Sequence, residues 1–163
     1  MSDGESKRIR CFGYVADESR RVLILGSMPS VKSLEKAEYR FRRVIASIAG
    51  ADYDGGYAQL LGNLKTLKIA LWDVVYECER KGSSDSEIKA AVPNDIAGFL
   101  KRYPNIERIA TNGSKAAELL EKNFPGLKFT RLPSTSPLNA RTTLRGLIAA
   151  YSAFIKGKTN DEN

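Results

Sequence analysis

Two short segments of the chain, residues 26–30 and residues 133–141, carry polar groups that could contact a ligand. The first, Gly26-Ser-Met-Pro-Ser30, directly follows an apolar run. Its glycine permits a close backbone approach and Pro29 fixes the turn, so the loop N–H groups could face an anion or a base. Many α/β proteins turn in this way without binding anything, which leaves an ordinary turn as the alternative.

Asp73 and Asn112 each stand at the end of a predicted strand. The Asp73 carboxylate could accept a hydrogen bond from a ring N–H of a nucleobase. It could equally accept from backbone N–H groups of a neighbouring loop, which is the more common role. Asn112 could pair with an amide edge of a base, or it could shape the turn that Gly113 continues.

The segment from Pro133 to Arg141 combines hydroxyl groups suited to phosphate with two rigid prolines and one apolar side chain, Leu138. An apolar residue at a loop tip can act as a wedge between base steps, or it can pack inward. Cations near the start of the following predicted helix oppose the helix dipole by about 0.3–1 kcal/mol each, and a bound phosphate would offset that cost. The candidate DNA-binding residues are Ser134, Thr135, Ser136, Pro137, Leu138, Asn139, Arg141 and Arg145.

Composition excludes several classes of chemistry. The 163 residues include no histidine and two cysteines, Cys11 and Cys78, which lie far apart. Ser-His-Asp catalysis and histidine acid–base chemistry are therefore excluded, and no metal site is expected. No apolar run is long enough to span a bilayer and the first residues do not resemble a signal segment, so we expect a cytoplasmic protein without membrane contact.

The charge is unevenly distributed along the chain. Lys and Arg number 26 and Asp and Glu number 19, giving a net charge of +7. A segment without acidic residues, which can attract a polyanion such as nucleic acid, extends from residue 122 to residue 160. The alternative is a solvated face with a basic tail. The basic residues of this segment are Lys122, Lys128, Arg131, Arg141, Arg145, Lys156 and Lys158.

Short apolar runs alternate with segments of helical spacing. The runs predict strands at 21–26, 69–75, 108–111 and 128–132. The spacing predicts helices at 34–48 (with Ser33 as its N-cap), 57–67, 94–103, 114–124 and 144–155. This alternation is typical of the α/β class, in which helices flank a parallel sheet and ligands bind beyond the carboxyl ends of the strands. We therefore expect one domain over 9–156, disordered tails at 1–8 and 157–163, and a site formed by loops 26–32, 73–85, 112–115 and 133–141.

Taken in order, the motifs resemble the uracil–DNA glycosylase superfamily, and most closely its hypoxanthine (deoxyinosine)–DNA glycosylase branch. The resemblance implies a three-layer α/β/α fold with a central four-stranded parallel sheet and a base-flipping pocket at its carboxyl edge. It also implies a monofunctional DNA repair enzyme that needs no cofactor and acts as a monomer on duplex DNA with a deaminated or mismatched base. The matching segments are Phe12-Gly-Tyr14, Val22-Leu-Ile-Leu-Gly-Ser-Met-Pro29, Ser33-Leu-Glu35, Leu71-Trp-Asp-Val74, Cys78-Glu-Arg80, Gly82-Ser83, Asp85-Ser86, Asn112-Gly113, Lys115-Ala116 and Leu132-Pro-Ser-Thr-Ser-Pro137.

The family roles transfer to individual positions of this chain. Asp73 falls where better-known relatives place a base-reading Asn, and Leu138 falls where the family's Leu enters the duplex. Phe41 matches a Phe that stacks near the base, although its helical spacing also fits a core residue. The expected base pocket consists of Gly26, Ser27, Met28, Pro29, Phe41, Asp73 and Asn112.

The chain also departs from the family pattern. Relatives carry a His-Pro-Arg-Asn segment with the catalytic Asn, whereas here the chain passes from Tyr39 directly to Arg40 and has no Asn between Ser27 and Gly62. Ser134 stands where the uracil enzymes have His. Ser27 stands where several relatives have an Asp or Asn that positions water. Asp73 is the remaining catalytic candidate, together with Glu77.

Three functions are compatible with these residues. The leading interpretation is a DNA glycosylase that removes hypoxanthine or uracil with impaired activity. The first alternative is a non-catalytic relative that binds damaged or mismatched DNA, which the shortened segment favours. The second is a small-nucleotide hydrolase or binding domain, which would need neither the basic segment nor Leu138 as a wedge.

Overall fold

The structure is a computed structural model that describes residues 7–10, 13–27, 38–80, 89–137 and 139–157. The residues named above that lie outside the described part of the chain are Cys11, Phe12, Met28, Pro29, Ser30, Ser33, Leu34, Glu35, Gly82, Ser83, Asp85, Ser86, Leu138 and Lys158. Within the described residues no helix is long and apolar enough to cross a membrane.

A four-stranded parallel sheet forms the centre of the fold. Its strands are β2 (Val22–Gly26), β3 (Ile69–Asp73), β6 (Arg108–Asn112) and β7 (Thr130–Leu132), in the order β3-β2-β6-β7. The pairing places Gly26 opposite Asp73 and Asn112 opposite Leu132. All four carboxyl ends therefore lie at one edge of the sheet, which confirms the predicted parallel arrangement.

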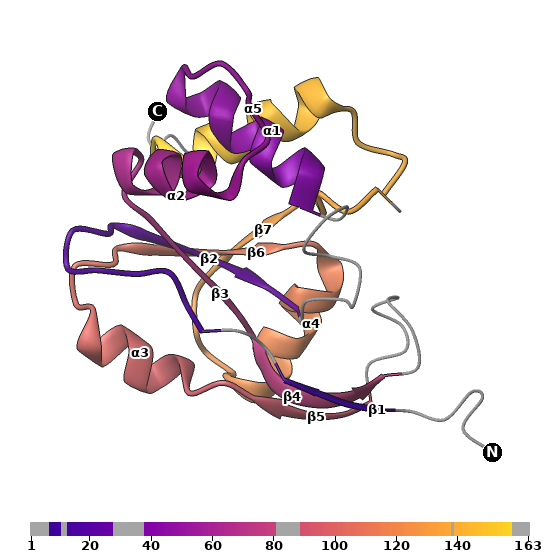
Figure 1. The fold of residues 1–163 in the computed structure, drawn as a ribbon. Helices are drawn as coiled ribbons and strands as arrows, with labels where there is room; N and C mark the ends of the chain where they lie inside the picture. Colours follow the sequence, from indigo (N-terminus) through magenta and orange to yellow (C-terminus); the bar gives the residue numbers. More distant parts are fainter. Residues whose placement is uncertain (1–6, 11–12, 28–37, 81–88, 138, 158–163) are drawn as a thin grey trace.

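Helices cover both faces of this sheet (Figure 1). On one face lie α1 (Glu38–Ala49), α2 (Tyr57–Thr66) and α5 (Leu144–Ile155), and on the other lie α3 (Ile96–Arg102) and α4 (Ser114–Asn123). Strand β2 is buried on both sides because alternate side chains point to opposite faces. Val22 and Ile24 pack in the cluster below α1, α2 and α5, whereas Leu23 and Leu25 pack in the cluster that includes α4. The predicted three-layer α/β/α fold is confirmed.

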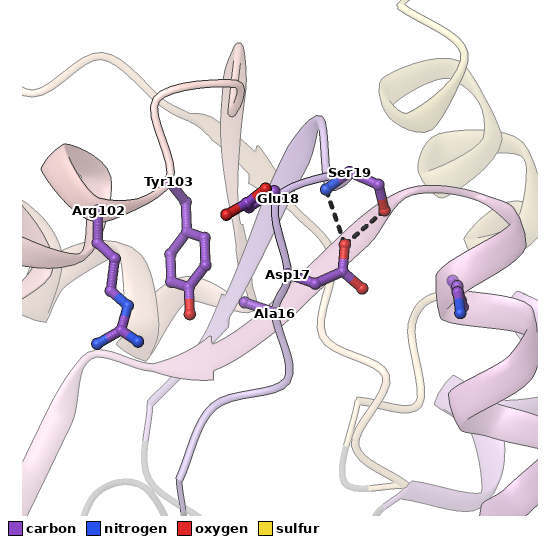
Figure 2. A pocket seen from close by; sticks show the side chains of 7 residues that line it. Ala16, Asp17, Glu18, Ser19, Arg102 and Tyr103 are labelled. Atoms are coloured by element: carbon purple, nitrogen blue, oxygen red, sulfur yellow. Dashed lines mark hydrogen bonds between the residues drawn. The ribbon is translucent and has the colours of Figure 1, made fainter.

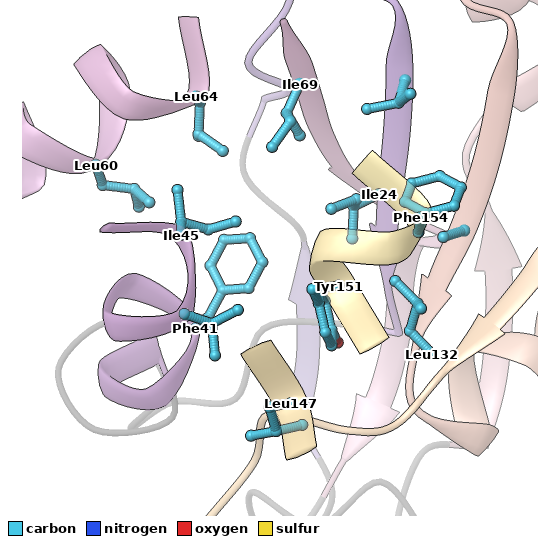
Figure 3. Close-up of a cluster of buried hydrophobic side chains, with 13 residues drawn as sticks. Ile24, Phe41, Ile45, Leu60, Leu64, Ile69, Leu132, Leu147, Tyr151 and Phe154 are labelled. Atoms are coloured by element: carbon cyan, nitrogen blue, oxygen red, sulfur yellow. The ribbon is translucent and has the colours of Figure 1, made fainter. Parts of the chain in front are cut away.

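The core beneath α1, α2 and α5 explains why these helices form (Figure 3). Their apolar stripes meet over the sheet, where fully burying one large aliphatic side chain stabilises the fold by about 1.5–3 kcal/mol. Most of these side chains are less than 5% exposed. The helical residues of this cluster are Phe41, Val44, Ile45, Leu60, Leu64, Leu147, Tyr151 and Phe154.

A second sheet corrects two predictions made from the sequence. Strands β1 (Lys7–Arg10), β4 (Val75–Arg80) and β5 (Lys89–Pro93) form an antiparallel sheet in the order β1-β4-β5. The sequence predicts a loop over 73–85 and a disordered tail over 1–8, yet β4 begins two residues after β3 ends, and β1 pairs with it through Lys7 and Arg8. None of these segments has the uniform apolar run of the central strands, so their pairing, of β1 with the distant β4 and of β4 with β5, identifies them as strands.

The helix and strand bounds differ slightly from prediction. The predicted strand 69–75 ends at Asp73, and β7 begins at Thr130 rather than at residue 128. Helix α3 begins at Ile96 rather than Asn94, because the Asp95 side chain accepts a hydrogen bond from Gly98 N (3.0 Å) and caps it. Helix α1 is described from residue 38, so the first residues of predicted helix 34–48 lie outside the described part.

An aromatic cluster joins β3 to the segment before β2. The Tyr14 ring meets the ring of Trp72 edge to face at 5.1 Å and that of Phe99 at 4.9 Å. Backbone bonds between Val15 and Leu71, both 2.9 Å, fix the same segment against β3. Tyr14 and Trp72 belong to two of the motifs that carry the family resemblance, and they act together in supporting the strand that ends at Asp73.

Candidate functional site at the carboxyl edge of the sheet

Three of the four predicted loops meet at the carboxyl edge of the parallel sheet. Gly26 ends β2 and Ser27 follows it, Asp73 ends β3, and the segment after β7 begins at Pro133. The fourth, 112–115, follows β6 and contacts the segment after β7 directly. The described parts of the four predicted segments thus follow one another along this edge in the strand order β3-β2-β6-β7, apart from β4, which leaves the edge as a strand.

Asp73 lies against the end of β2. A Cβ atom placed on Gly26 would be 2.5 Å from Asp73 Oδ1, so any larger residue at position 26 would displace this carboxylate. The half-buried Asp73 side chain therefore depends on the glycine of the first loop. This proximity joins two residues that the sequence assigns to the base pocket.

Asn94 is a site residue that sequence reasoning missed. It is 4% exposed, and its Nδ2 donates to the backbone carbonyl of Asp73 at 2.8 Å. Its backbone N donates to Val74 O at 2.7 Å, while Val74 N and Val75 N donate to Gly26 O and Ser27 O. These bonds fix the backbone where β3 turns into β4, and an isolated Asn next to a proline gives no signal of that role.

Asn112 is engaged with the segment after β7. Its Oδ1 accepts from Thr135 N, and its Nδ2 donates to Thr135 Oγ1, both at 2.9 Å. Thr135 is 3% exposed, which supports a structural role for it. Gly113 has φ +96°, and a Cβ there would be 3.0 Å from Ser134 Cβ. These contacts favour the interpretation of Asn112-Gly113 as a turn that holds the next loop.

The segment from Ser134 to Thr142 is folded by its own polar groups. Ser134 Oγ accepts from Ser136 N at 3.0 Å, and Asn139 Nδ2 donates to Ser134 O at 2.9 Å and to Thr142 Oγ1 at 3.2 Å. We call residues 133–142 the recognition loop. Its half-buried Ser134, Ser136 and Asn139 define the loop's shape, whereas Pro137 is exposed.

Arg40 holds the recognition loop from outside. Its guanidinium donates to Ser136 O and Asn139 O, both at 3.0 Å, and also to Thr142 O. One charged side chain on α1 thus fixes three backbone carbonyls about 100 residues away. In the sequence, Arg40 is noted only as the residue that directly follows Tyr39 where relatives carry the His-Pro-Arg-Asn segment, and a contact at that separation leaves no local pattern.

Tyr151 supports the start of the same loop. Its hydroxyl donates to Pro133 O at 2.8 Å from a fully buried ring, and burial raises the pKa of this phenol above its usual range. The phenol therefore stays protonated and keeps donating. Thr143 then caps α5 by accepting from Gly146 N at 3.0 Å.

Phe41 lies in the core rather than at the site. It is 4% exposed and its ring meets that of Tyr151 edge to face at 6.4 Å (Figure 3). A ring so enclosed offers no free face to a base. The structure favours the core interpretation that helical spacing alone suggested, over the stacking role implied by the family resemblance.

The basic segment from 122 to 160 is divided between the two edges of the sheet. Arg141 in the recognition loop and Arg145 just after it are exposed, and within the described residues neither has a carboxylate within 4 Å. Lys122 and Lys156 lie at the far ends of α4 and α5, and Arg131 pairs with Glu121. Only part of the segment's charge therefore faces a ligand at the carboxyl edge.

A hollow of about 690 Å³ lies at the opposite, amino edge (Figure 2). Its polar groups already bind one another: Asp17 accepts from Ser19 N at 2.8 Å and pairs with Arg20 at 2.8 Å. Among the described residues there is no cluster of three His, Cys, Asp or Glu side chains that could hold a metal ion. The lining residues are Ala16, Asp17, Glu18, Ser19, Lys65, Arg102 and Tyr103.

Comparisons with known proteins agree with this geometry. No protein-family model matches the chain. The chain is 37% identical over 141 residues to a hypoxanthine DNA glycosylase of Methanosarcina acetivorans, covering 81% of this chain and 89% of that protein. It is 36% identical over 114 residues to a hypoxanthine DNA glycosylase of Methanosarcina barkeri, covering 66% of this chain and 72% of that protein.

The fold has a counterpart among solved structures. The solution NMR structure of a candidate uracil DNA glycosylase from Methanosarcina acetivorans matches with a TM-score of 0.77 and 32% identity, over 93% of this chain and 99% of that one. Sequence, fold and the placement of the motif loops point to the same group. The chain therefore belongs to the hypoxanthine DNA glycosylase branch of the uracil–DNA glycosylase superfamily.

Proposed function

We propose that this protein hydrolyses the N-glycosidic bond of hypoxanthine, and of uracil as a second substrate, in duplex DNA. The observation that carries the proposal is that Gly26, Asp73 and the recognition loop meet at one edge, in a chain whose relatives are named hypoxanthine DNA glycosylases. Enzymes that act on a base must first take it out of the stack. The carboxyl edge of the sheet is where we expect the extruded base to enter.

The proposed reaction needs one water molecule and no redox partner. Water oxygen bonds to C1′ of the deoxyribose, the bond from C1′ to the base nitrogen breaks, and the base leaves with a proton from water. The transition state resembles an oxocarbenium ion, so catalysis requires a positioned water, a stabilised cationic sugar and donors to the departing base. The backbone N–H groups and hydroxyls of this edge can supply the donors.

Asp73 is our candidate for both recognition and catalysis. Hypoxanthine and uracil each present a ring N–H group, from which a carboxylate can accept a hydrogen bond. A carboxylate at the pocket edge can also orient water and stabilise positive charge on the sugar. The contact with Gly26 and the bond from Asn94 to its backbone place Asp73 at the end of β3 with little freedom.

One feature favours a second candidate function, binding of damaged or mismatched DNA without cleavage. The family resemblance implies a catalytic Asn in a His-Pro-Arg-Asn segment, and this chain has no Asn between Ser27 and Gly62. Losing one positioned catalytic group commonly costs about 10²–10³ in rate. We therefore propose slower excision than in relatives that retain the segment.

Parallel excision and binding assays separate the two functions. Duplexes containing deoxyinosine, deoxyuridine or only normal bases are incubated with the protein, and base release and binding are measured on the same samples. Slow release of hypoxanthine supports the glycosylase. Tight, lesion-selective binding without release supports the non-catalytic alternative, and equal weak binding to all three duplexes contradicts both. Insertion of a His-Pro-Arg-Asn segment between Tyr39 and Arg40 is expected to speed release if the glycosylase proposal holds.

We also propose that the protein acts in the cytoplasm as a monomer. The monomer is what the resemblance to the uracil–DNA glycosylase superfamily implies. Light scattering with and without a deoxyinosine duplex tests the oligomeric state. The expected masses are those of one chain alone and of one chain bound to one duplex.

A further inference from the structure

A cluster of two tyrosines and an arginine lies on α1 and the segment that follows it. The Arg43 guanidinium carbon is 5.6 Å from the centre of the Tyr39 ring and 5.1 Å from that of the Tyr53 ring. The two rings meet edge to face at 5.7 Å with an interplanar angle of 89°, and Arg43 Nη1 donates to Tyr39 Oη at 3.1 Å. We call these three residues the Tyr39 cluster.

Within the Tyr39 cluster, Tyr39 is open to solvent, whereas Tyr53 and Arg43 are half-buried. Tyr39 is 47% exposed, whereas Phe41 on the same helix is 4% exposed. Within the described residues, Arg43 has no carboxylate within 4 Å, and the Asp54 carboxylate beside Tyr53 accepts from Gly56 N at 2.7 Å instead. The cluster thus presents an aromatic face and a cation that no described carboxylate neutralises.

The position of the cluster connects it to the proposed DNA site. Arg40, the residue after Tyr39, donates to Ser136 O and Asn139 O of the recognition loop. Tyr39 and Arg43 are one turn apart and therefore share a helix face next to the one that Arg40 uses. A DNA strand that contacts the recognition loop can continue along α1 to the cluster.

From this placement we propose that the Tyr39 cluster stacks a base of the DNA strand next to the extruded nucleotide, while Arg43 faces a neighbouring phosphate. The inference rests on the proposed DNA-binding function and adds a second contact surface to it. Aromatic side chains stack on every base because every base has a π-face, and arginine adds both charge and stacking. Such a surface favours bases that have left the duplex stack, so the occupant is unpaired strand rather than intact duplex.

A binding comparison tests the proposal. The probes are two deoxyinosine duplexes, one fully paired and one with two mismatched pairs next to the deoxyinosine, and the dissociation constant is measured by anisotropy. The wild type is expected to prefer the duplex with unpaired bases. Because stacking contributes about 1–3 kcal/mol per base, Tyr39→Ala should weaken binding to that duplex by about 5-fold to 150-fold. Binding to the fully paired duplex should change much less.

Three variants keep the outcome interpretable. Tyr39→Phe keeps the ring and should retain the preference. Arg43→Gln should lower the preference for the duplex with unpaired bases and should reduce the salt dependence of binding to that duplex. Tyr57→Ala is the matched control, because Tyr57 is 55% exposed and lies against an arginine, Arg42, at 5.7 Å, outside the cluster. Unchanged preference in Tyr39→Ala and Arg43→Gln, or equal loss in Tyr57→Ala, overturns the inference. A wild type that binds deoxyinosine duplexes no better than normal DNA contradicts the proposed function instead.

Discussion

At each edge of the parallel sheet an arginine donates hydrogen bonds to backbone carbonyls, but the two arginines have different roles. At the amino edge, Arg20 donates to Ile69 O at 2.8 Å and pairs with Asp17, and so closes a loop onto the sheet. At the carboxyl edge, Arg40 donates to carbonyls of the recognition loop and leaves that loop's exposed side facing solvent. At the amino edge, Arg20 only joins the loop to the sheet. At the carboxyl edge, Arg40 keeps the recognition loop folded while the exposed side of the loop can face a ligand.

The hollow at the amino edge and the proposed site at the carboxyl edge also differ in their charged groups. The hollow is lined by the carboxylates of Asp17 and Glu18 and by the cations of Lys65 and Arg102, so it has no excess of positive charge for a phosphate, and Asp17 is already paired with Arg20. The carboxyl edge instead has Asp73 at a strand end, the exposed Arg141 in the recognition loop and the exposed Arg145 just after it. We therefore locate the proposed site by its polar groups and by charge suited to DNA, and not by concavity.

The largest expected difference between the edges concerns catalysis. Asp73→Ala should lower the rate of hypoxanthine release by about 10²–10³, the usual cost of one positioned catalytic group. Asp17→Ala, the matched change at the amino edge, should leave the rate per folded molecule unchanged. Single-turnover release from a deoxyinosine duplex provides the measurement. Equal rates in the two variants would remove Asp73 from the mechanism.

The two arginines give the next largest contrast. Arg40→Met removes charge-assisted hydrogen bonds that contribute about 1.5–3 kcal/mol each, so binding to deoxyinosine DNA should weaken about tenfold or more. Arg20→Met should lower the free energy of unfolding by a similar 1.5–3 kcal/mol, about the strength of one such bond, without weakening DNA binding. Urea unfolding and anisotropy titrations on both variants check this. Weakened binding in Arg20→Met but not in Arg40→Met would reverse the assignment of the edges.

Salt dependence distinguishes the edges by charge. If Arg141 and Arg145 each neutralise one phosphate, replacing both by Gln should make the slope of log K against log salt shallower by about 1.8. Replacing Lys122 and Lys156, at the opposite edge, should leave the slope unchanged. Titrations between low and moderate salt give the slopes, and an equal change in the two double variants would mean diffuse attraction to the whole protein.

A smaller effect is expected at the amino edge as the pH falls. Hydrogen bonds from Arg20 and then Ser19 hold the pKa of the Asp17 carboxyl well below its usual range. Because the folded pKa is the lower one, this stabilisation is present above about pH 4 and is lost as the pH falls further. Asp17→Asn should therefore flatten the acid limb of the stability curve, measured by thermal unfolding between pH 2 and 6. A parallel limb in the variant would contradict the pairing.

The parallel sheet and its helices could be predicted from the sequence because their signals are local. Apolar runs such as 22–25 and helical spacing such as that from Phe41 to Ile48 depend only on neighbouring residues. The meeting of Gly26, Asp73 and Pro133 at one edge then follows from parallel strand pairing. The sheet of β1, β4 and β5 lacked such a signal, since none of its strands is a uniform apolar run and β1 pairs with a strand about 70 residues away.

The supports of the site were the part that sequence could not predict. Arg40, Asn94 and Tyr151 each bond a backbone carbonyl of a segment distant in sequence, at Ser136, Asp73 and Pro133. Because every residue has a backbone carbonyl, the residue type at the acceptor position gives no sign of such a contact in the sequence. Phe41 shows the reverse: its local helical spacing predicted core packing correctly, whereas the family resemblance suggested a base contact that its burial does not favour.

Amide hydrogen exchange with and without a deoxyinosine duplex tests most directly which edge binds DNA. The wild-type protein is compared with and without saturating duplex, and the control is the same duplex with a normal base. We predict slower exchange for 134–142 in the presence of DNA and no change for 16–21, which precede β2 at the amino edge. Protection of 16–21 and 101–107 without protection of 134–142 would place the DNA at the hollow and contradict the account.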